Sequence, residues 1–316
     1  MGYKSAMILT QLKYGMLRLV MLILSAGLAS TVSAAETGPV KVSVTTGMIA
    51  DLVRQVGGDR VEVTQLMGPG IDPHLYKPTS SDASALGKAD VVFYNGLMLE
   101  GRMGELFERL SKSGKNIRAV TDSIPEDRLI SAPDFEDHHD PHLWFDVDLW
   151  RQTIPTIVKG LSDADPDGRA IYEKNAADLG ARLSALHAWC LSQAATLPES
   201  ARILVTSHDA YNYLGRAYGF RVVGLQGAST VSEAALADVA SLVDFIRDQN
   251  VKAIFVESSV NPTAIKRVAA DAGVVVGGEL FSDAMGMPGE VVNGYDTGTY
   301  DGMVRHNLST IIEALK

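Results

Sequence analysis

Residues 166–196 read PDGRAIYEKNAADLGARLSALHAWCLSQAAT and contain no proline after the first position. Apolar side chains recur along this stretch at the spacing of one helix face, at Leu179, Leu183, Leu186 and Cys190. Pro198 follows, and a proline cannot continue a helix because it has no backbone N–H. The stretch therefore predicts one long helix of about seven to eight turns, and a second helix is expected before it, at about 148–163.

Short β-rich runs alternate with helical patterns on both sides of this helix. On the N-terminal side, strands are expected at 40–46, 61–67 and 91–96, and helices at 48–58 and 80–89. On the C-terminal side, strands are expected at 201–207, 221–227, 251–257 and 274–280. Helices are expected near 208–219, at 232–250, between the last two strands and from about 300. Such alternation is typical of parallel sheets with crossover helices.

The predicted fold class is therefore α/β, with two lobes that have parallel-sheet cores and are joined by the long helix. The expected boundaries are 36–163 for the N-terminal lobe, 164–197 for the connecting helix and 198–316 for the C-terminal lobe. A content of 46% hydrophobic and 21% charged residues fits a folded globular protein.

Residues 1–35 differ from the rest of the chain. They contain no acidic residue, and Lys4, Lys13 and Arg18 precede the apolar run LVMLILSAGLA at 19–29. Small residues follow, with Val-Ser-Ala at 32–34 matching a small-x-small cleavage site. This pattern predicts a secretory signal peptide. An uncleaved membrane anchor is the alternative, but eleven apolar residues are few for a span of the bilayer. Met16, just before Arg18, is an alternative translation start.

The number and position of the cysteines indicate the cellular compartment of the protein. No cysteine follows the apolar run, so we expect no lipid on a mature N-terminal cysteine. The single cysteine, Cys190, can form no internal disulfide, and we expect it to be a small buried side chain of the long helix. An exported, disulfide-free protein indicates the bacterial periplasm. Beyond residue 35 the chain has 38 acidic and 25 basic residues, which argues against a nucleic-acid partner.

Four residues are candidate metal ligands because each lies just past an expected strand or at the mouth of a helix. They are His74, His142, His208 and Asp283. The ligand crevice of an open α/β sheet lies at the carboxyl ends of its strands, and two candidates come from each lobe. Three imidazoles and one carboxylate suit Zn²⁺. Taken singly, each candidate also fits a surface, helix-start or capping position.

The tripeptide Asp-Pro-His occurs twice, at 72–74 and 140–142. Proline fixes its own φ and restricts the residue before it, so each histidine projects from a stiffened turn. Two copies of this tripeptide favour a role of its histidines as metal ligands more strongly than one copy would.

Eight motifs run in order through nearly the whole mature chain, among them LMGPGIDPHLYKPTSSD, DPHLWFDVDLW, VTSHDAYNYLGRAYGF and GGELFSDAMG. With these motifs the chain resembles the zinc/manganese-binding solute-binding proteins of ABC transporters, the TroA-like family (solute-binding family 9). The resemblance implies two α/β lobes joined by a rigid helix, with the metal in the inter-lobe cleft. It assigns His74 and His142 from the first lobe, and His208 and Asp283 from the second, as ligands. It also implies a monomer that delivers metal to a membrane permease and is not an enzyme.

The third ligand position bears on which metal is carried. Members regarded as manganese-selective usually have glutamate there, whereas this chain has His208. A nitrogen-rich set favours Zn²⁺, with Mn²⁺ as the alternative. Zinc-dedicated relatives often have a long His-rich loop before the second ligand. Here His138 and His139 are either a short metal-collecting segment or, as we favour, ordinary loop residues.

Three further side chains are assigned from position alone. Glu257 follows a strand and either orients a ligand histidine or forms a structural ion pair. We expect His187 to pack on the long helix and His306 to be exposed on the last helix.

Two other functions remain as alternatives. A metal-dependent hydrolase would need an open coordination position for water, and G-x-S-x-G, P-loop and H-E-x-x-H motifs are absent. A surface adhesin role, attributed to some relatives, fits poorly with the missing lipid-anchor cysteine.

Overall fold

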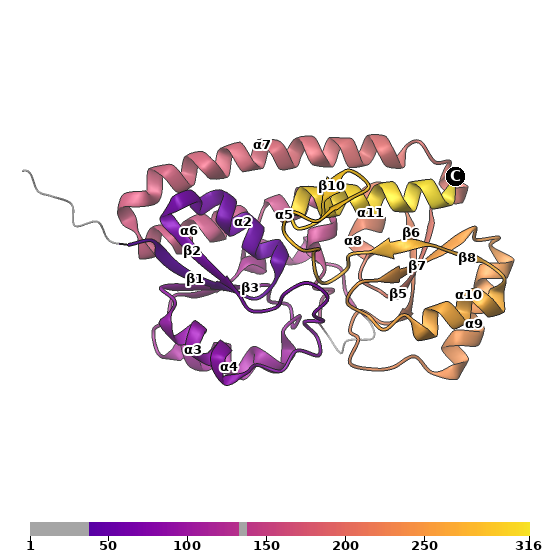
Figure 1. The fold of residues 1–316 in the computed structure, drawn as a ribbon, viewed down its shortest axis with the longest axis horizontal. Helices are drawn as coiled ribbons and strands as arrows, with labels where there is room; N and C mark the ends of the chain where they lie inside the picture. The colour runs from indigo at the N-terminus through magenta and orange to yellow at the C-terminus, as the bar shows by residue number, and fades with distance from the viewer. Residues whose placement is uncertain (1–37, 133–137) are drawn as a thin grey trace, which may run out of the picture. The chain divides into compact units, whose positions relative to one another are not determined.

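The computed structural model describes residues 38–132 and 138–316 (Figure 1). The expected signal peptide at 1–35 lies outside the described residues. Residues 39–316 form one compact unit. Among the described residues, every helix is too short or too polar to cross a membrane.

The first lobe is built on a four-stranded parallel sheet. Its strand order is β2-β1-β3-β4, with β1 at Val40–Val44, β2 at Val61–Gln65, β3 at Val91–Tyr94 and β4 at Ile117–Ala119. Helices α2 (Gly47–Gly57), α3 (Ser80–Lys88) and α4 (Gly104–Lys112) connect or follow these strands. The predicted strands are present, whereas β4 was not predicted because three residues are too few to show a strand pattern.

The second lobe has four strands side by side, each paired in parallel with a neighbour (Figure 1). They are β5 (Ile203–His208), β6 (Arg221–Gln226), β7 (Ala253–Glu257) and β8 (Val275–Leu280). The helices are α8 (Asn212–Tyr218), α9 (Leu236–Asp248), α10 (Thr263–Ala272) and α11 (Tyr300–Leu315). A short hairpin of β9 (Val291–Val292) and β10 (Tyr295–Asp296) was not predicted. The α/β fold class with parallel-sheet cores is confirmed.

The long helix is present as α7, Arg169–Ala194, and spans 26 residues. Its buried side chains lie on one face and include Leu179, Leu183, Leu186 and Cys190. Helices α2 and α6 of the first lobe and α8 and α11 of the second lobe all pack against it (Figure 1). The connecting helix therefore contributes to the packing of both lobes.

The helix predicted at 148–163 is wrong as one element. The structure has two helices there, α5 (Val147–Arg151) and α6 (Ile154–Ala164). Pro155 has no N–H to donate to the preceding turn, so the first helix cannot continue through it. At the second position of α6 the same proline is tolerated, because the first-turn N–H groups have no helical partner.

One hydrophobic core extends through both lobes and includes the buried rings of Trp144, Tyr211 and Tyr300. The Trp144 indole donates a hydrogen bond to the Ser282 carbonyl at 3.0 Å, and the Tyr300 hydroxyl donates to the Trp144 carbonyl at 2.6 Å. The Tyr300 backbone N–H, at the start of α11, donates to the Asp51 carboxylate of α2 at 3.1 Å. These bonds join the lobes through buried groups.

Candidate metal centre

Both Asp-Pro-His tripeptides form the same turn. The backbone N–H of His74 donates to Asp72 Oδ1 at 2.8 Å, and that of His142 donates to Asp140 Oδ1 at 2.9 Å. An aspartate side chain that accepts the amide two residues later is a local turn that needs no sheet or helix. The repeated tripeptide thus places each histidine by the same local device.

The two turns differ in how they hold the histidine ring. Asp140 Oδ1 also lies 2.7 Å from His142 Nδ1, and both groups are buried. In the described part of the chain, no such contact holds His74 Nδ1. His142 is therefore fixed through its ring and its backbone, whereas His74 is fixed through its backbone only.

His208 is the last residue of β5, and Glu257 is the last residue of the adjacent β7. The His208 N–H donates to Glu257 Oε1 at 2.9 Å. Glu257 Oε2 lies 2.6 Å from His208 Nδ1, although the two atoms are out of line for a hydrogen bond. Of the two roles considered for Glu257, the structure supports the one in which it orients a candidate ligand.

Asp283 lies in the loop after β8 and is buried. The Ser259 hydroxyl lies 3.4 Å from Asp283 Oδ2, and the neighbouring Ser282 carbonyl receives the Trp144 indole N–H. Ser259 of the second lobe thus contacts Asp283, and a first-lobe side chain anchors the residue before it.

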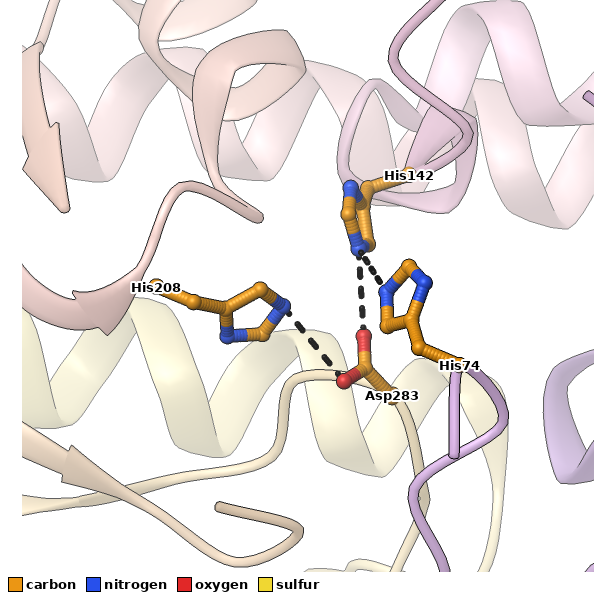
Figure 2. Close-up of side chains that lie close together, drawn as sticks. All are labelled: His74, His142, His208 and Asp283. Carbon is orange, nitrogen blue, oxygen red and sulfur yellow. Dashed lines mark hydrogen bonds and ion pairs between the residues drawn. The ribbon is translucent and has the colours of Figure 1, made fainter. Parts of the chain in front are cut away.

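The four candidate ligands converge from both lobes on one buried point (Figure 2). One donor atom from each of them lies within 4.8 Å of all the others. The Nε2 atoms of His74 and His142 are 3.3 Å apart, and Asp283 oxygens lie 3.3 Å from His142 Nε2 and 3.4 Å from His208 Nε2. Bonds of about 2.0–2.1 Å to a tetrahedral zinc ion would place neighbouring donor atoms about 3.3–3.4 Å apart.

Unpaired atoms in the cluster also fit a cation. Among the described residues, His208 Nε2 and Asp283 Oδ1 are buried without a hydrogen-bond partner. Such atoms are unfavourable in a protein interior unless another group binds them. Nitrogen and oxygen donors that face a common centre satisfy this need when they coordinate a metal ion.

Opposing charges set the protonation of the cluster. Burial alone would lower the pKa of His142, but Asp140 and Asp283 raise this pKa to about 9. Burial is likewise outweighed at His208, where Glu257 and Asp283 hold the pKa well above its usual value. Burial would raise the pKa of Asp283, yet His208 and His142 hold it well below the ordinary range. Burial lowers the pKa of His74 to about 3, so this imidazole stays neutral.

The remaining histidines lie outside the cluster. His138 is exposed, and His139 is half-buried, pairs with Ser131 in an isolated β-bridge and lies 3.9 Å from Glu126. His187 is half-buried on α7, with its ring 5.5 Å from that of Tyr218. Neither residue of the 138–139 pair lies among the converging donors.

The expectation of an exposed His306 is wrong. The side chain is buried on the face of α11 that packs against β8, and its Nε2 lies 3.1 Å from the Glu279 carbonyl. Its neighbour Asn307 exchanges hydrogen bonds with the Phe281 backbone at 2.9 and 2.7 Å. This part of α11 therefore holds the chain segment that leads to Asp283.

Comparison with known proteins shows the family to which the chain belongs. A model of the periplasmic component A of the zinc-uptake complex, ZnuA, matches residues 42–314. The chain is 44% identical over 281 residues to the manganese-binding lipoprotein MntA of Bacillus subtilis, covering 87% of this chain and 90% of the relative. It is 43% identical over 287 residues to the zinc-binding protein TroA of Treponema pallidum, covering 89% and 91%.

A solved structure of the periplasmic zinc-binding protein TroA from Treponema pallidum superposes with a TM-score of 0.84 at 41% identity. The match covers 88% of this chain and 99% of that one. The chain therefore belongs to the ZnuA/TroA family of metal-binding, extracytoplasmic substrate-binding proteins of ABC transporters, which are transport proteins and not enzymes.

Proposed function

We propose that this protein captures a divalent transition metal outside the cytoplasm and hands it to the membrane permease of an ABC transporter. The metal is cargo, held by His74, His142, His208 and Asp283. The observation that carries this assignment is the convergence of four buried donor atoms within 4.8 Å of one another. Four protein donors complete a tetrahedral shell, which suits retention and transport more than catalysis at an open position.

Zinc is the proposed cargo, with manganese as the alternative. Relatives of nearly equal identity are named for manganese and for zinc, so overall similarity does not choose between the metals. The donor set does favour one, because three imidazole nitrogens and one carboxylate suit Zn²⁺, whereas Mn²⁺ prefers more oxygen.

Residues 1–35 are proposed to be a cleaved signal peptide, followed by lobes at 36–163 and 198–316 and the connecting segment at 164–197. Several relatives are named lipoproteins. Here the one cysteine, Cys190, is buried in α7 and is not placed for lipid attachment. We infer a mature chain free in the periplasm, and the intact mass of the exported protein tests this: a mass increase from an acyl group would contradict it.

A competitive Zn²⁺/Mn²⁺ titration of the metal-stripped protein tests the proposed site. His208→Ala should weaken zinc binding by more than about 100-fold, since even residues that only support a ligand contribute 10–100-fold. His138→Ala is the matched control, because it removes an exposed imidazole outside the cluster. Unchanged zinc affinity in His208→Ala would show that the proposed ligand set is wrong.

A further inference from the structure

A single hydrogen bond joins the loop that carries His74 to the opposite lobe. The Thr230 hydroxyl, in the loop between β6 and α9, donates to Asp72 Oδ2 at 2.6 Å across 158 residues of sequence. Thr230 is buried and Asp72 is partly buried. Among the described residues, this is the only hydrogen bond between the loop at 66–79 and the second lobe.

Asp72 uses its two oxygens for two different tasks. Oδ2 accepts the Thr230 hydroxyl, while Oδ1 accepts the backbone N–H of His74 at 2.8 Å. The carboxylate thus links a second-lobe hydroxyl to the backbone of a first-lobe candidate ligand. If Thr230 moves away from this carboxylate, the turn that places His74 loses its hydrogen bond to the second lobe.

The other Asp-Pro-His turn is connected across the lobes in a comparable but stronger way. Asp140 Oδ2 accepts from Asn212 at 3.2 Å, and the Asp140 carbonyl accepts from the Tyr213 hydroxyl at 3.0 Å. Asp140 also contacts the His142 ring directly. His142 therefore has several supports, whereas His74 depends on the Asp72 turn and its one contact with Thr230.

The position of this contact relative to solvent also matters. Ile71, beside Asp72, is 39% exposed, and Val231, beside Thr230, is 58% exposed. His74 itself is buried. The Asp72–Thr230 pair thus joins two loops that each carry an exposed residue beside it, whereas the candidate ligand that the pair supports is buried.

We propose that the Asp72–Thr230 hydrogen bond is a latch between the lobes, which positions His74 and thereby sets how fast bound metal leaves. The proposal rests on the proposed role of His74 as a ligand. Thr230 is a positioning residue that does not touch the metal. With the latch closed, the turn that carries His74 cannot move away from the second lobe without breaking a hydrogen bond to a charged acceptor, and such bonds are among the stronger ones in proteins.

The test compares Thr230→Val, which keeps the shape but removes the hydroxyl, with Thr230→Ser, which keeps the hydroxyl. Zinc-loaded protein is mixed with excess chromophoric chelator, and the release rate is followed by stopped flow. Thr230→Val should release zinc roughly tenfold faster, while Thr230→Ser should stay within about twofold of the unmodified protein.

A double-mutant comparison keeps the proposal separate from a general loss of structure. In an Asp72→Ala background, Thr230→Val should cause no further acceleration, because the acceptor is already gone. Equal release rates for Thr230→Val and the unmodified protein would overturn the latch. A tenfold acceleration that persists in the Asp72→Ala background would also overturn it, because Thr230 would then act through another group.

The outcome for the proposed function can be told apart from the outcome for the latch. If His208→Ala weakens zinc binding but Thr230→Val leaves release unchanged, the metal site stands and the latch is wrong. If neither His208→Ala nor Thr230→Val affects zinc, the proposed ligand set itself fails, and the latch fails with it.

Discussion

Two of the three candidate ligand histidines are braced by a carboxylate on the ring nitrogen that faces away from the cluster. Asp140 serves His142, and Glu257 serves His208. A carboxylate at Nδ1 leaves Nε2 free for the metal and increases the basicity of the ring. The same carboxylate makes the metal-free imidazole hold a proton more tightly. Metal and proton therefore compete at these two residues.

This competition predicts a pH dependence of zinc binding. The pKa of His142 is raised to about 9 and that of His208 is also raised, whereas His74, with a pKa of about 3, has no proton to lose. Zinc affinity should rise with pH up to about 9, and binding at pH 7 should release about two protons. Calorimetry in buffers of different ionisation enthalpy counts these protons, and a count near zero would contradict the assignment.

The same shift predicts the pH dependence of the metal-free fold. The pKa of His142 is higher in the folded chain, about 9, than its ordinary value of 6.5. Its contribution to the free energy of unfolding is therefore complete below about pH 6.5 and lost as the pH rises through about 9. The midpoint temperature of thermal unfolding of the metal-free protein should therefore fall over this alkaline range. The midpoint of the zinc-loaded protein should not fall in this way, because its His142 carries no such proton.

Removing the brace on His208 should weaken zinc binding without removing a ligand. Glu257→Gln keeps the size of the side chain but loses its charge, and we expect zinc affinity to fall about 10–100-fold. Glu313→Gln, on an exposed position of α11, is the matched control and should leave affinity unchanged. Equal affinities of the two variants in a competition titration would rule out an orienting role for Glu257.

At the level of elements, α7 does more than join two sheets. Its buried face packs against helices of both lobes, so removing part of that face should destabilise the whole molecule and not one lobe. The α5–α6 break lies beside it, where Pro155 divides what would otherwise be a second continuous helix. Among the described helices, the longest is therefore the one that contacts both lobes.

Two leucines of α7 provide a matched test. Leu186 is fully buried, whereas Leu191, five residues later, is 45% exposed. Leu186→Ala should lower the free energy of unfolding by about 2–5 kcal/mol, because it removes buried methyl groups and leaves a cavity. Leu191→Ala should change it by less than about 0.5 kcal/mol. Urea unfolding measures both, and similar losses would contradict the burial of this helix face.

For the molecule as a whole, the lobes share a core in addition to the connecting helix. The hydrogen bonds from Trp144 to Ser282 and from Tyr300 to Asp51 and Trp144 cross between lobes in buried surroundings. A wide opening would have to break these bonds and expose the aromatic rings of the core. Release of metal is thus expected to require local movement of loops rather than separation of the lobes.

Solution scattering tests this expectation. The radius of gyration should differ by less than about 1 Å between metal-free and zinc-loaded protein, as for other pre-organised binding sites. Hydrogen exchange should in contrast change at the loops 66–79 and 227–235, which carry the Asp72–Thr230 pair. A large decrease in radius on zinc binding would instead indicate hinge closure of whole lobes.

Local patterns predicted the elements that local chemistry controls. The spacing of Leu179, Leu183 and Leu186 and the absence of proline predicted α7, and β-rich runs predicted the strand on which His208 lies. The errors have local and tertiary causes. The β4 strand is too short to show a pattern, and Pro155 divides the 148–163 segment, whereas the burial of His306 on α11 depends on packing against β8.

The amino-acid sequence was sufficient for the order of most of the longer strands and helices and for the four candidate ligands, because turn chemistry, periodicity and strand ends are encoded within short segments. Their role in metal binding stays a prediction until His208→Ala is measured. Only the tertiary structure identified Glu257 as a contact of His208, 49 residues away, and Thr230 as the donor to Asp72, 158 residues away. His208 and Glu257 meet because β5 and β7 are neighbouring strands of the second lobe, whereas Thr230 and Asp72 meet because the two lobes pack on one helix and share one core.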